Sequence, residues 1–177
     1  MINKLIEGNN RFVNNQYFVE KRQEYVDGQN PSVIIICCSD SRLTTDYIFD
    51  LDIGDVFEIV NAGNVIDDLA IENIQFALDN FDITDIICCC HEKCGAISSG
   101  YRTKIYGDKF SYPLLYDLIE SSIVTPWHND ENNIIASIKQ NAINSRDKIM
   151  AHTKPRGIVN LYCCYYNLRS GKVDFFI

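Results

Sequence analysis

The sequence lacks a basic stripe and carries an excess of acidic residues. Its 177 residues include 16 Lys and Arg against 24 Asp and Glu, which gives a formal net charge of -8, and the basic residues are scattered along the chain. Nucleic-acid-binding proteins need clustered positive charge, and anionic membranes attract it as well. We therefore expect neither nucleic acid nor a membrane as a partner.

Long apolar runs and linkers are also missing. No run approaches the roughly 20 apolar residues that a helix needs to cross a bilayer, and the start, MINKLIEGNNRF, lacks the apolar centre of a signal peptide. The chain has no repeat and no tract rich in Gly, Pro and Ser. We expect a single cytoplasmic domain over residues 1–177, with 1–30 as a helical arm and 31–177 as an α/β core.

The sequence contains eight cysteines but no C-x-x-C redox motif. Seven of them are immediate neighbours of one another, at 37–38, 88–90 and 163–164, inside or at the ends of apolar runs. Neighbouring cysteines cannot easily form a disulfide with each other, and a free cysteine behaves as a small buried apolar residue. We therefore expect reduced thiols in a reducing compartment.

Apolar segments of two kinds alternate along the chain. The patterns predict strands over 31–38, 55–64, 83–90, 157–168 and 172–177, and helices over 2–15, 68–81, 112–124 and 129–150. Pro126 is expected to stop the third of these helices. Strands that alternate with helices favour an α/β fold of three layers. We expect a mostly parallel four-stranded central sheet flanked by helices, with an additional C-terminal edge strand.

Metal-binding side chains follow two of the predicted strands. Cys38 ends IIICC, and His91 and Cys94 follow IICCC in the spacing H-x-x-C. Ligands of α/β proteins bind beyond the carboxyl ends of the strands, and three protein ligands with one open position are typical of catalytic zinc. The spacing alone leaves a second interpretation open, in which both cysteines are core thiols and His91 caps a helix or bonds a carbonyl group.

Two charged residues beside Cys38 favour the catalytic interpretation. Asp40 and Arg42 follow Cys38 at alternate positions, in CSDSR. An Asp held by an Arg can accept a proton from a metal-activated water, whereas an unrestrained Asp could displace that water. The alternative is an ordinary surface ion pair, worth about 0–1 kcal/mol.

Together these residues give the chain a close resemblance to the β-class carbonic anhydrases, whose pattern is C-x-D-x-R followed by H-x-x-C-G. The two motifs read CSDSR (38–42) and HEKCG (91–95) here. The likeness continues through most of the chain, in LIEGNNRF (5–12), IFDLDIGDVFEIVNAGN (48–64), NIQFAL (73–78), ENNIIASI (131–138) and YYNLRSGKVDFF (165–176).

The resemblance implies a zinc lyase that interconverts CO2 and bicarbonate by attack of zinc-bound hydroxide, in a homodimer or a multiple of dimers. It assigns zinc to Cys38, His91 and Cys94. Asp40 would accept a hydrogen bond from the hydroxide, and Arg42 would hold Asp40 away from the metal. The loop Ala62, Gly63 and Asn64 would line the substrate pocket. The remaining histidines, His128 and His152, are expected to lie on the surface rather than to shuttle protons.

Two positions depart from the family pattern. Val60 stands where the family usually has Arg, and Cys90 where it commonly has Gly. Neither change removes a zinc ligand. Three alternatives stay open: a hydrolase of carbon disulfide or carbonyl sulfide with the same metal set, a catalytically silent zinc-containing regulatory homologue, and a redox protein that uses its thiols.

Overall fold

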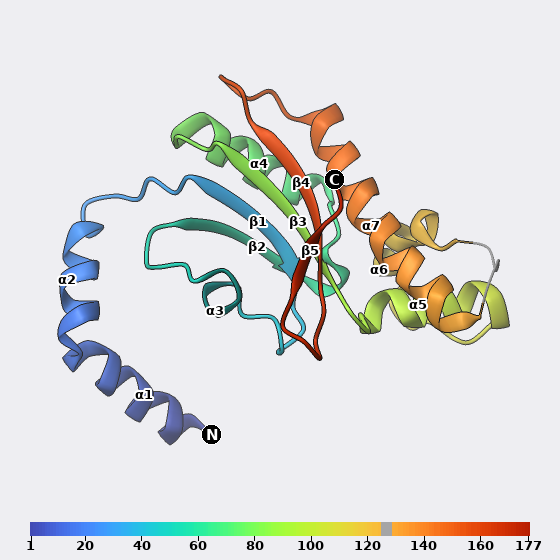
Figure 1. Cartoon of the computed structure of the whole chain (residues 1–177), viewed down its shortest axis with the longest axis horizontal. Coiled ribbons are helices and arrows are strands. Elements are labelled where there is room, and N and C mark those ends of the chain that lie inside the picture. Colours follow the sequence, from blue (N-terminus) through green and yellow to red (C-terminus); the bar gives the residue numbers. More distant parts are fainter. Residues whose placement is uncertain (125–128) are drawn as a thin grey trace.

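The computed structural model, which describes residues 1–124 and 129–177, has an α/β fold built on a five-stranded sheet (Figure 1). The strands are β1 (Val33–Cys38), β2 (Val56–Asn61), β3 (Asp85–His91), β4 (Asn160–Tyr166) and β5 (Val173–Phe175). Their order in the sheet is β2-β1-β3-β4-β5. The first four are parallel, and β5 pairs antiparallel with β4. The predicted fold class, including the C-terminal edge strand, is confirmed.

The strands are apolar on both faces because both faces are covered. In β1, Ile34 and Ile36 belong to the main core, whereas Ile35 and Cys37 belong to a smaller cluster on the opposite face. This explains why the run IIICC does not alternate with polar residues, as a strand with one wet face would.

The described residues also form seven α-helices and two short 3-10 turns, of which α1 and α2 precede β1 and the others lie between strands. They are α1 (Ile2–Asn14), α2 (Gln16–Glu24), α3 (Thr45–Phe49), η1 (Ala62–Asn64), α4 (Asp68–Asn80), α5 (Gly95–Tyr106), α6 (Pro113–Ile119), η2 (Glu120–Ser122) and α7 (Asp130–His152). The predicted helices at 68–81 and 129–150 are present. Both begin at capping side chains, since Asp67 accepts from the Ala70 amide and Asn129 from the Asn132 amide. None of the helices in the described ranges is long and apolar enough to cross a membrane.

Helices cover the two faces of the sheet unequally. The longest helix, α7, packs along β3 and β4, and α4 lies against β2; Figure 1 shows both on the same side of the sheet. The smaller cluster on the other face is closed by Phe49 of α3 and by Leu51 just after that helix. The second helical layer is therefore short.

The N-terminal arm projects from the body of the molecule (Figure 1). Neither α1 nor α2 contains a buried residue. The arm is fixed at α2, where the Tyr17 hydroxyl donates to Asp52 and Lys21 Nζ lies 3.4 Å from an oxygen of Asp52. Beyond the end of α2, the ring of Tyr25 lies against Gly54, where a Cβ atom would clash with it.

Two helices, α3 and α5, were not predicted, and several predicted elements are shorter in the structure. The helix α2 lies within the predicted helical arm, residues 1–30, although no separate helix was predicted there. The sequence of α5, GAISSGYRTKIY, is rich in residues of low helix propensity. One of them, Gly100, packs closely against α6, since a Cβ there would lie 2.7 Å from Ile119 Cδ1. The predicted strand 55–64 ends at Asn61 and continues as η1.

Pro126 and His128 lie outside the described residues, and His152 is exposed.

Candidate metal centre

The three predicted metal ligands converge at the carboxyl edge of the sheet. Cys38 is the last residue of β1 and His91 the last residue of β3, and these two strands are direct neighbours. Cys94 immediately precedes α5. Their ligand atoms all lie within 4.8 Å of one another, and all three residues are buried. Residues that are 53 positions apart in the sequence thus form one group that could hold a metal ion.

The orientation of His91 indicates which nitrogen faces the cluster. Its ring is fully buried, and Nδ1 lies 2.9 Å from the carbonyl oxygen of Glu92. Because a carbonyl oxygen can only accept, Nδ1 carries the proton and Nε2 presents a lone pair. Nε2 is buried and has no hydrogen-bond partner among the residues that the structure describes. A buried acceptor without a partner is costly, and a metal ion in the cluster would satisfy it in the usual arrangement of a ligating histidine.

The two sulfur ligands interact with each other. A hydrogen bond from the Cys94 thiol lowers the pKa of Cys38 to about 4, while that bond and burial raise the pKa of Cys94 above its usual range. Cys38 is therefore the thiolate of the pair and Cys94 its donor. Since metals bind thiolates, a divalent cation between them would take the place of the shared proton. The donor set of two sulfurs and one imidazole fits zinc.

Asp40 lies beside this group, but it is not a member of it. Arg42 Nε lies 2.8 Å from Asp40 Oδ1 and Arg42 Nη2 lies 2.6 Å from Oδ2, so the guanidinium engages both carboxylate oxygens. The backbone amide of Arg42 also donates to Oδ1, at 3.1 Å. These bonds to Arg42 hold the pKa of Asp40 well below its usual range, so the carboxylate stays ionised.

The η1 turn approaches the cluster through its backbone. The Gly63 amide donates to Cys38 Sγ at 3.3 Å. Gly63 has φ +80, and a Cβ there would lie 3.2 Å from Ala96 Cβ, so this position requires glycine. Gly63 and Asn64 are buried, and Ala62 is exposed. Of the three loop residues predicted from the sequence, Gly63 thus hydrogen-bonds a sulfur of the cluster.

Residues of α7 that the sequence did not point to hold this turn. Asn141 Nδ2 donates to the Gly63 carbonyl at 2.8 Å, and Ser145 Oγ donates to the Asn64 carbonyl at 3.2 Å. Both side chains are buried. In the sequence, the signal for these two residues is their spacing of four within a predicted helix. That spacing places both polar side chains on the helix face that also buries apolar side chains.

The two positions that depart from the family pattern differ in their surroundings. Cys90 is buried, and its thiol lies 3.2 Å from the Cys164 carbonyl, away from the metal group. All eight cysteines are free thiols. Val60, by contrast, is 51% exposed next to the η1 turn.

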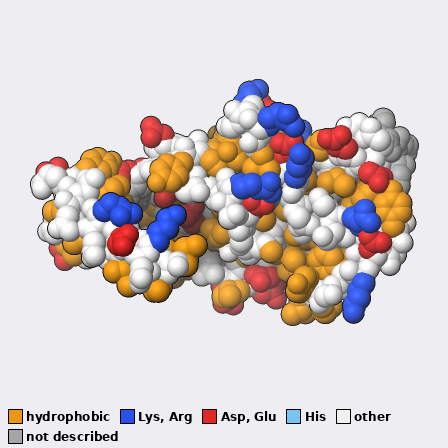
Figure 2. All heavy atoms as spheres, turned by 90° about the horizontal axis from the view of Figure 1, so that it is seen from below, with side chains coloured by type: hydrophobic (Ala, Val, Ile, Leu, Met, Phe, Trp, Pro, Cys, Tyr) orange, Lys and Arg blue, Asp and Glu red, His pale blue; other side chains and the backbone are white. Residues whose placement is uncertain are grey.

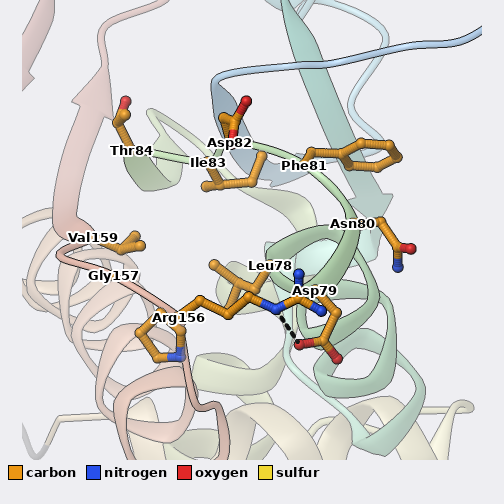
Figure 3. Close-up of a pocket in the computed structure, with 11 residues that line it drawn as sticks. Leu78, Asp79, Asn80, Phe81, Asp82, Ile83, Thr84, Arg156, Gly157 and Val159 are labelled. Carbon is orange, nitrogen blue, oxygen red and sulfur yellow. Dashed lines mark ion pairs between the residues drawn. The ribbon is translucent and has the colours of Figure 1, made fainter.

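A separate hollow lies at the opposite edge of the sheet (Figure 3). It has a volume of about 400 Å³ and is formed around the end of α4 and the starts of β3 and β4, with Arg156 Nε 3.8 Å from Asp79 Oδ1 at its rim. None of the predicted site residues lines it. Because ligands of such sheets bind at the carboxyl ends of the strands, the chemistry belongs to the cluster around Cys38.

The fold and the cluster define a class of protein: a parallel α/β protein with a Cys2His centre and an adjacent Asp–Arg pair. Comparison with known families agrees, since the carbonic anhydrase family profile matches residues 33–173. A carbonic anhydrase of Synechocystis sp. is 34% identical over 131 residues, covering 69% of this chain and 47% of the relative. Carbonic anhydrase 2 of Mycobacterium tuberculosis is 35% identical over 100 residues, covering 54% and 48%.

Solved structures show the same fold. The β-carbonic anhydrase CcaA superposes with a TM-score of 0.83 at 27% identity, covering 99% of this chain and 95% of that one. A Coccomyxa β-carbonic anhydrase has a TM-score of 0.84 at 18% identity, with coverage of 98% and 85%.

The chain belongs to the carbonic anhydrase family, in its β class. Zinc is the cofactor that this membership and the donor set imply. The chain spans about half the length of the curated relatives it matches.

Proposed function

We propose that this protein catalyses the reversible hydration of CO2 to bicarbonate, with zinc held by Cys38, His91 and Cys94. The observation that carries the proposal is the buried His91 Nε2, which finds no hydrogen-bond partner within residues 1–124 and 129–177 and belongs to the same group as two sulfur atoms. Family membership supports the reaction. When bound, zinc would supply the Lewis acidity that makes water a nucleophile near neutral pH.

In this proposal, Asp40 and Arg42 orient the attacking water. The Asp40 carboxylate is ionised and its side chain is only 17% exposed, so it can accept a hydrogen bond from the water and aim the water's lone pair at CO2. Arg42 occupies both carboxylate oxygens and so keeps Asp40 from becoming a fourth metal ligand. A catalytically silent zinc site would need neither residue.

The η1 turn is proposed to line the substrate pocket. The Gly63 amide is already used by Cys38. Nδ2 of Asn64 is buried and has no hydrogen-bond partner in the described part of the chain. We assign this donor to an oxygen of bicarbonate, because a buried donor is costly when it stays unpaired.

We further propose that residues 1–177 form one domain that assembles as a homodimer or a multiple of dimers. The N-terminal arm supports the assembly into dimers, because apolar side chains of α1 are exposed. Apolar groups are visible on the arm at the left of Figure 2. A solved relative from Sordaria macrospora is described as tetrameric. Eight free thiols support a reducing cytoplasm as its location.

Stopped-flow CO2 hydration by the zinc-loaded protein tests the reaction. The proposal expects proton release that Asp40→Ala and Cys94→Ala abolish. The same preparation, offered carbon disulfide or carbonyl sulfide, should release no sulfide above background. Sulfide release without CO2 hydration would favour the hydrolase alternative. Inactivity toward all three substrates, with zinc bound, would favour the silent homologue.

A further inference from the structure

A row of buried polar residues runs along α7 at every fourth position. Asn133, Ser137, Asn141 and Ser145 are each at most 5% exposed. Burying polar side chains is unfavourable unless they are hydrogen-bonded, so such a row needs partners. Two of its members, Asn141 and Ser145, find them in consecutive carbonyl groups of the η1 turn, at Gly63 and Asn64.

Asn141 and Cys38 are connected through a single residue. The Asn141 amide donates to the Gly63 carbonyl at 2.8 Å, and the Gly63 amide donates to Cys38 Sγ at 3.3 Å. Gly63 lacks a side chain and has the widest backbone freedom of any residue type. Its own amide can therefore stay directed at the sulfur only if something outside the residue fixes its conformation.

The Asn141 side chain is itself held from the η2 turn. Ser122 Oγ donates to Asn141 Oδ1 at 3.2 Å, and Asn144 Nδ2 donates to Ser122 Oγ at 3.0 Å. Ser122 and Asn141 are both buried. With Oδ1 occupied as an acceptor, the Nδ2 group of Asn141 is the one that faces Gly63. The hydrogen bonds thus run from Asn144 through Ser122, Asn141 and Gly63 to Cys38.

We propose that Asn141 is a positioning residue of the metal centre, which directs the Gly63 amide at the Cys38 sulfur and so sets the electron density that this sulfur offers the metal. The inference rests on the proposed function only in taking Cys38 as a metal ligand. Outer partners of metal ligands orient them, and losing such a partner typically costs about 10- to 100-fold in metal affinity. A residue that merely fills the core would lower stability without changing the sulfur–metal bond.

The test compares Asn141→Leu with Ser145→Ala in protein loaded with Co²⁺, whose sulfur-to-cobalt charge-transfer absorption reports on the thiolates. Leu keeps the branched skeleton and the number of side-chain heavy atoms of Asn141, although its methyl groups are larger, and it removes both hydrogen bonds. An N–H donor lowers the energy of the sulfur lone pair, so its loss should move the band to longer wavelength. Ser145→Ala removes a bond to the same turn but not to Gly63, and its band should match that of the unmodified protein. Zinc affinity, measured by chelator competition, should fall about 10- to 100-fold in Asn141→Leu. It should stay unchanged in Ser145→Ala.

Ser122→Ala makes the test decisive if Asn141→Leu does not fold. It removes the donor to Asn141 Oδ1 and the acceptor of Asn144 Nδ2 but leaves the bond from Asn141 to Gly63, so a smaller shift of the band in the same direction is expected. A folded Asn141→Leu with an unchanged band and affinity would overturn the proposal, as would equal shifts in Asn141→Leu and Ser145→Ala. If Asn141→Leu is unfolded, an unchanged band in Ser122→Ala would overturn it. None of these measurements uses CO2, so a failure of the proposed reaction would be seen separately.

Discussion

Arg42 binds Asp40 with two side-chain nitrogens, Nε at 2.8 Å from Oδ1 and Nη2 at 2.6 Å from Oδ2. Two parallel hydrogen bonds to a carboxylate fix its plane as well as its position. The pair stands next to Cys38 in the sequence and next to the three-ligand group in space. An isolated ion pair of this kind contributes little to stability when exposed. We therefore expect the main role of Arg42 to be the orientation of the Asp40 carboxylate.

Arg42→Ala should therefore lower kcat/KM for CO2 hydration by about 100-fold or more, the usual range for a misplaced proton acceptor. Zinc content should be unchanged, because Arg42 is not a ligand. The matched control is Arg102→Ala, which breaks a pair of similar length with Asp108, at 2.7 Å, on the exposed surface of α5. If Arg42→Ala and Arg102→Ala are equally active in stopped-flow assays, Arg42 has no role in orienting Asp40.

Cys94→Ala and Cys90→Ala should differ in metal content. Cys94 belongs to the metal group, whereas Cys90 contacts the Cys164 carbonyl. Cys94→Ala should lose stoichiometric zinc in elemental analysis, and Cys90→Ala should keep it while losing about 1 kcal/mol of unfolding free energy from the smaller side chain. Retention of zinc by Cys94→Ala would remove that residue from the ligand set.

Gly63→Ala should damage both the fold and the metal site. Its φ of +80 is unfavourable for a residue with a side chain, and a Cβ there would lie 3.2 Å from Ala96 Cβ, closer than an ordinary contact. Strain of this kind costs about 1–3 kcal/mol. Chemical denaturation measures the loss, with Gly157→Ala as the control. A Cβ at exposed Gly157 meets no atom within 4 Å, so that change should stay within about 0.5 kcal/mol. Equal stabilities would show that the turn accommodates a side chain.

The activity should rise toward alkaline pH. Two thiolates neutralise the charge of a divalent zinc ion, so the ion lowers the pKa of the attacking water less than a set of three neutral histidines, for which that pKa is about 7. Because the deprotonated form attacks, the rate increases as pH rises through this pKa. A profile of kcat/KM between pH 6 and about 9.5 should climb throughout the upper half. A flat profile, or one that falls, contradicts the assignment.

The exposed face of α1 should determine assembly. Ile2, Leu5 and Ile6 are each more than 50% exposed, and apolar faces of this kind are typical of contacts between subunits. Leu5→Glu with Ile6→Glu should shift the protein from dimer to monomer in sedimentation experiments. Lys4→Glu introduces the same side chain on the opposite side of the helix and should leave the dimer intact. A wild-type protein that is monomeric at micromolar concentration would contradict the dimer.

The convergence of the three predicted metal ligands on one group could be anticipated because it depends on strand ends. Cys38 and His91 each end an apolar run, and the carboxyl ends of neighbouring parallel strands necessarily meet at one edge of the sheet. The carboxylate and guanidinium of Asp40 and Arg42 are two residues apart, so their contact is local as well. These parts of the site follow from short-range patterns and one topological rule.

The remaining features depend on packing that no local pattern specifies. The helix α5 is stabilised by the burial of Ile97 and Tyr101 rather than by propensity. Asn141 reaches Gly63 across 78 residues of sequence, and this contact exists only because the fold brings α7 next to the η1 turn. The polar row along α7 was visible in the sequence, but its partners could not be identified before the η1 turn was placed.

Cys38, His91 and Cys94 are proposed to share one zinc ion that keeps an open position. X-ray absorption at the zinc edge of the purified protein reports the atoms that coordinate this ion. We expect two sulfur ligands at about 2.3 Å, with one nitrogen and one further light atom at about 2.0–2.1 Å. A shell of four sulfurs, a shell without sulfur, or protein that takes up no zinc would contradict it.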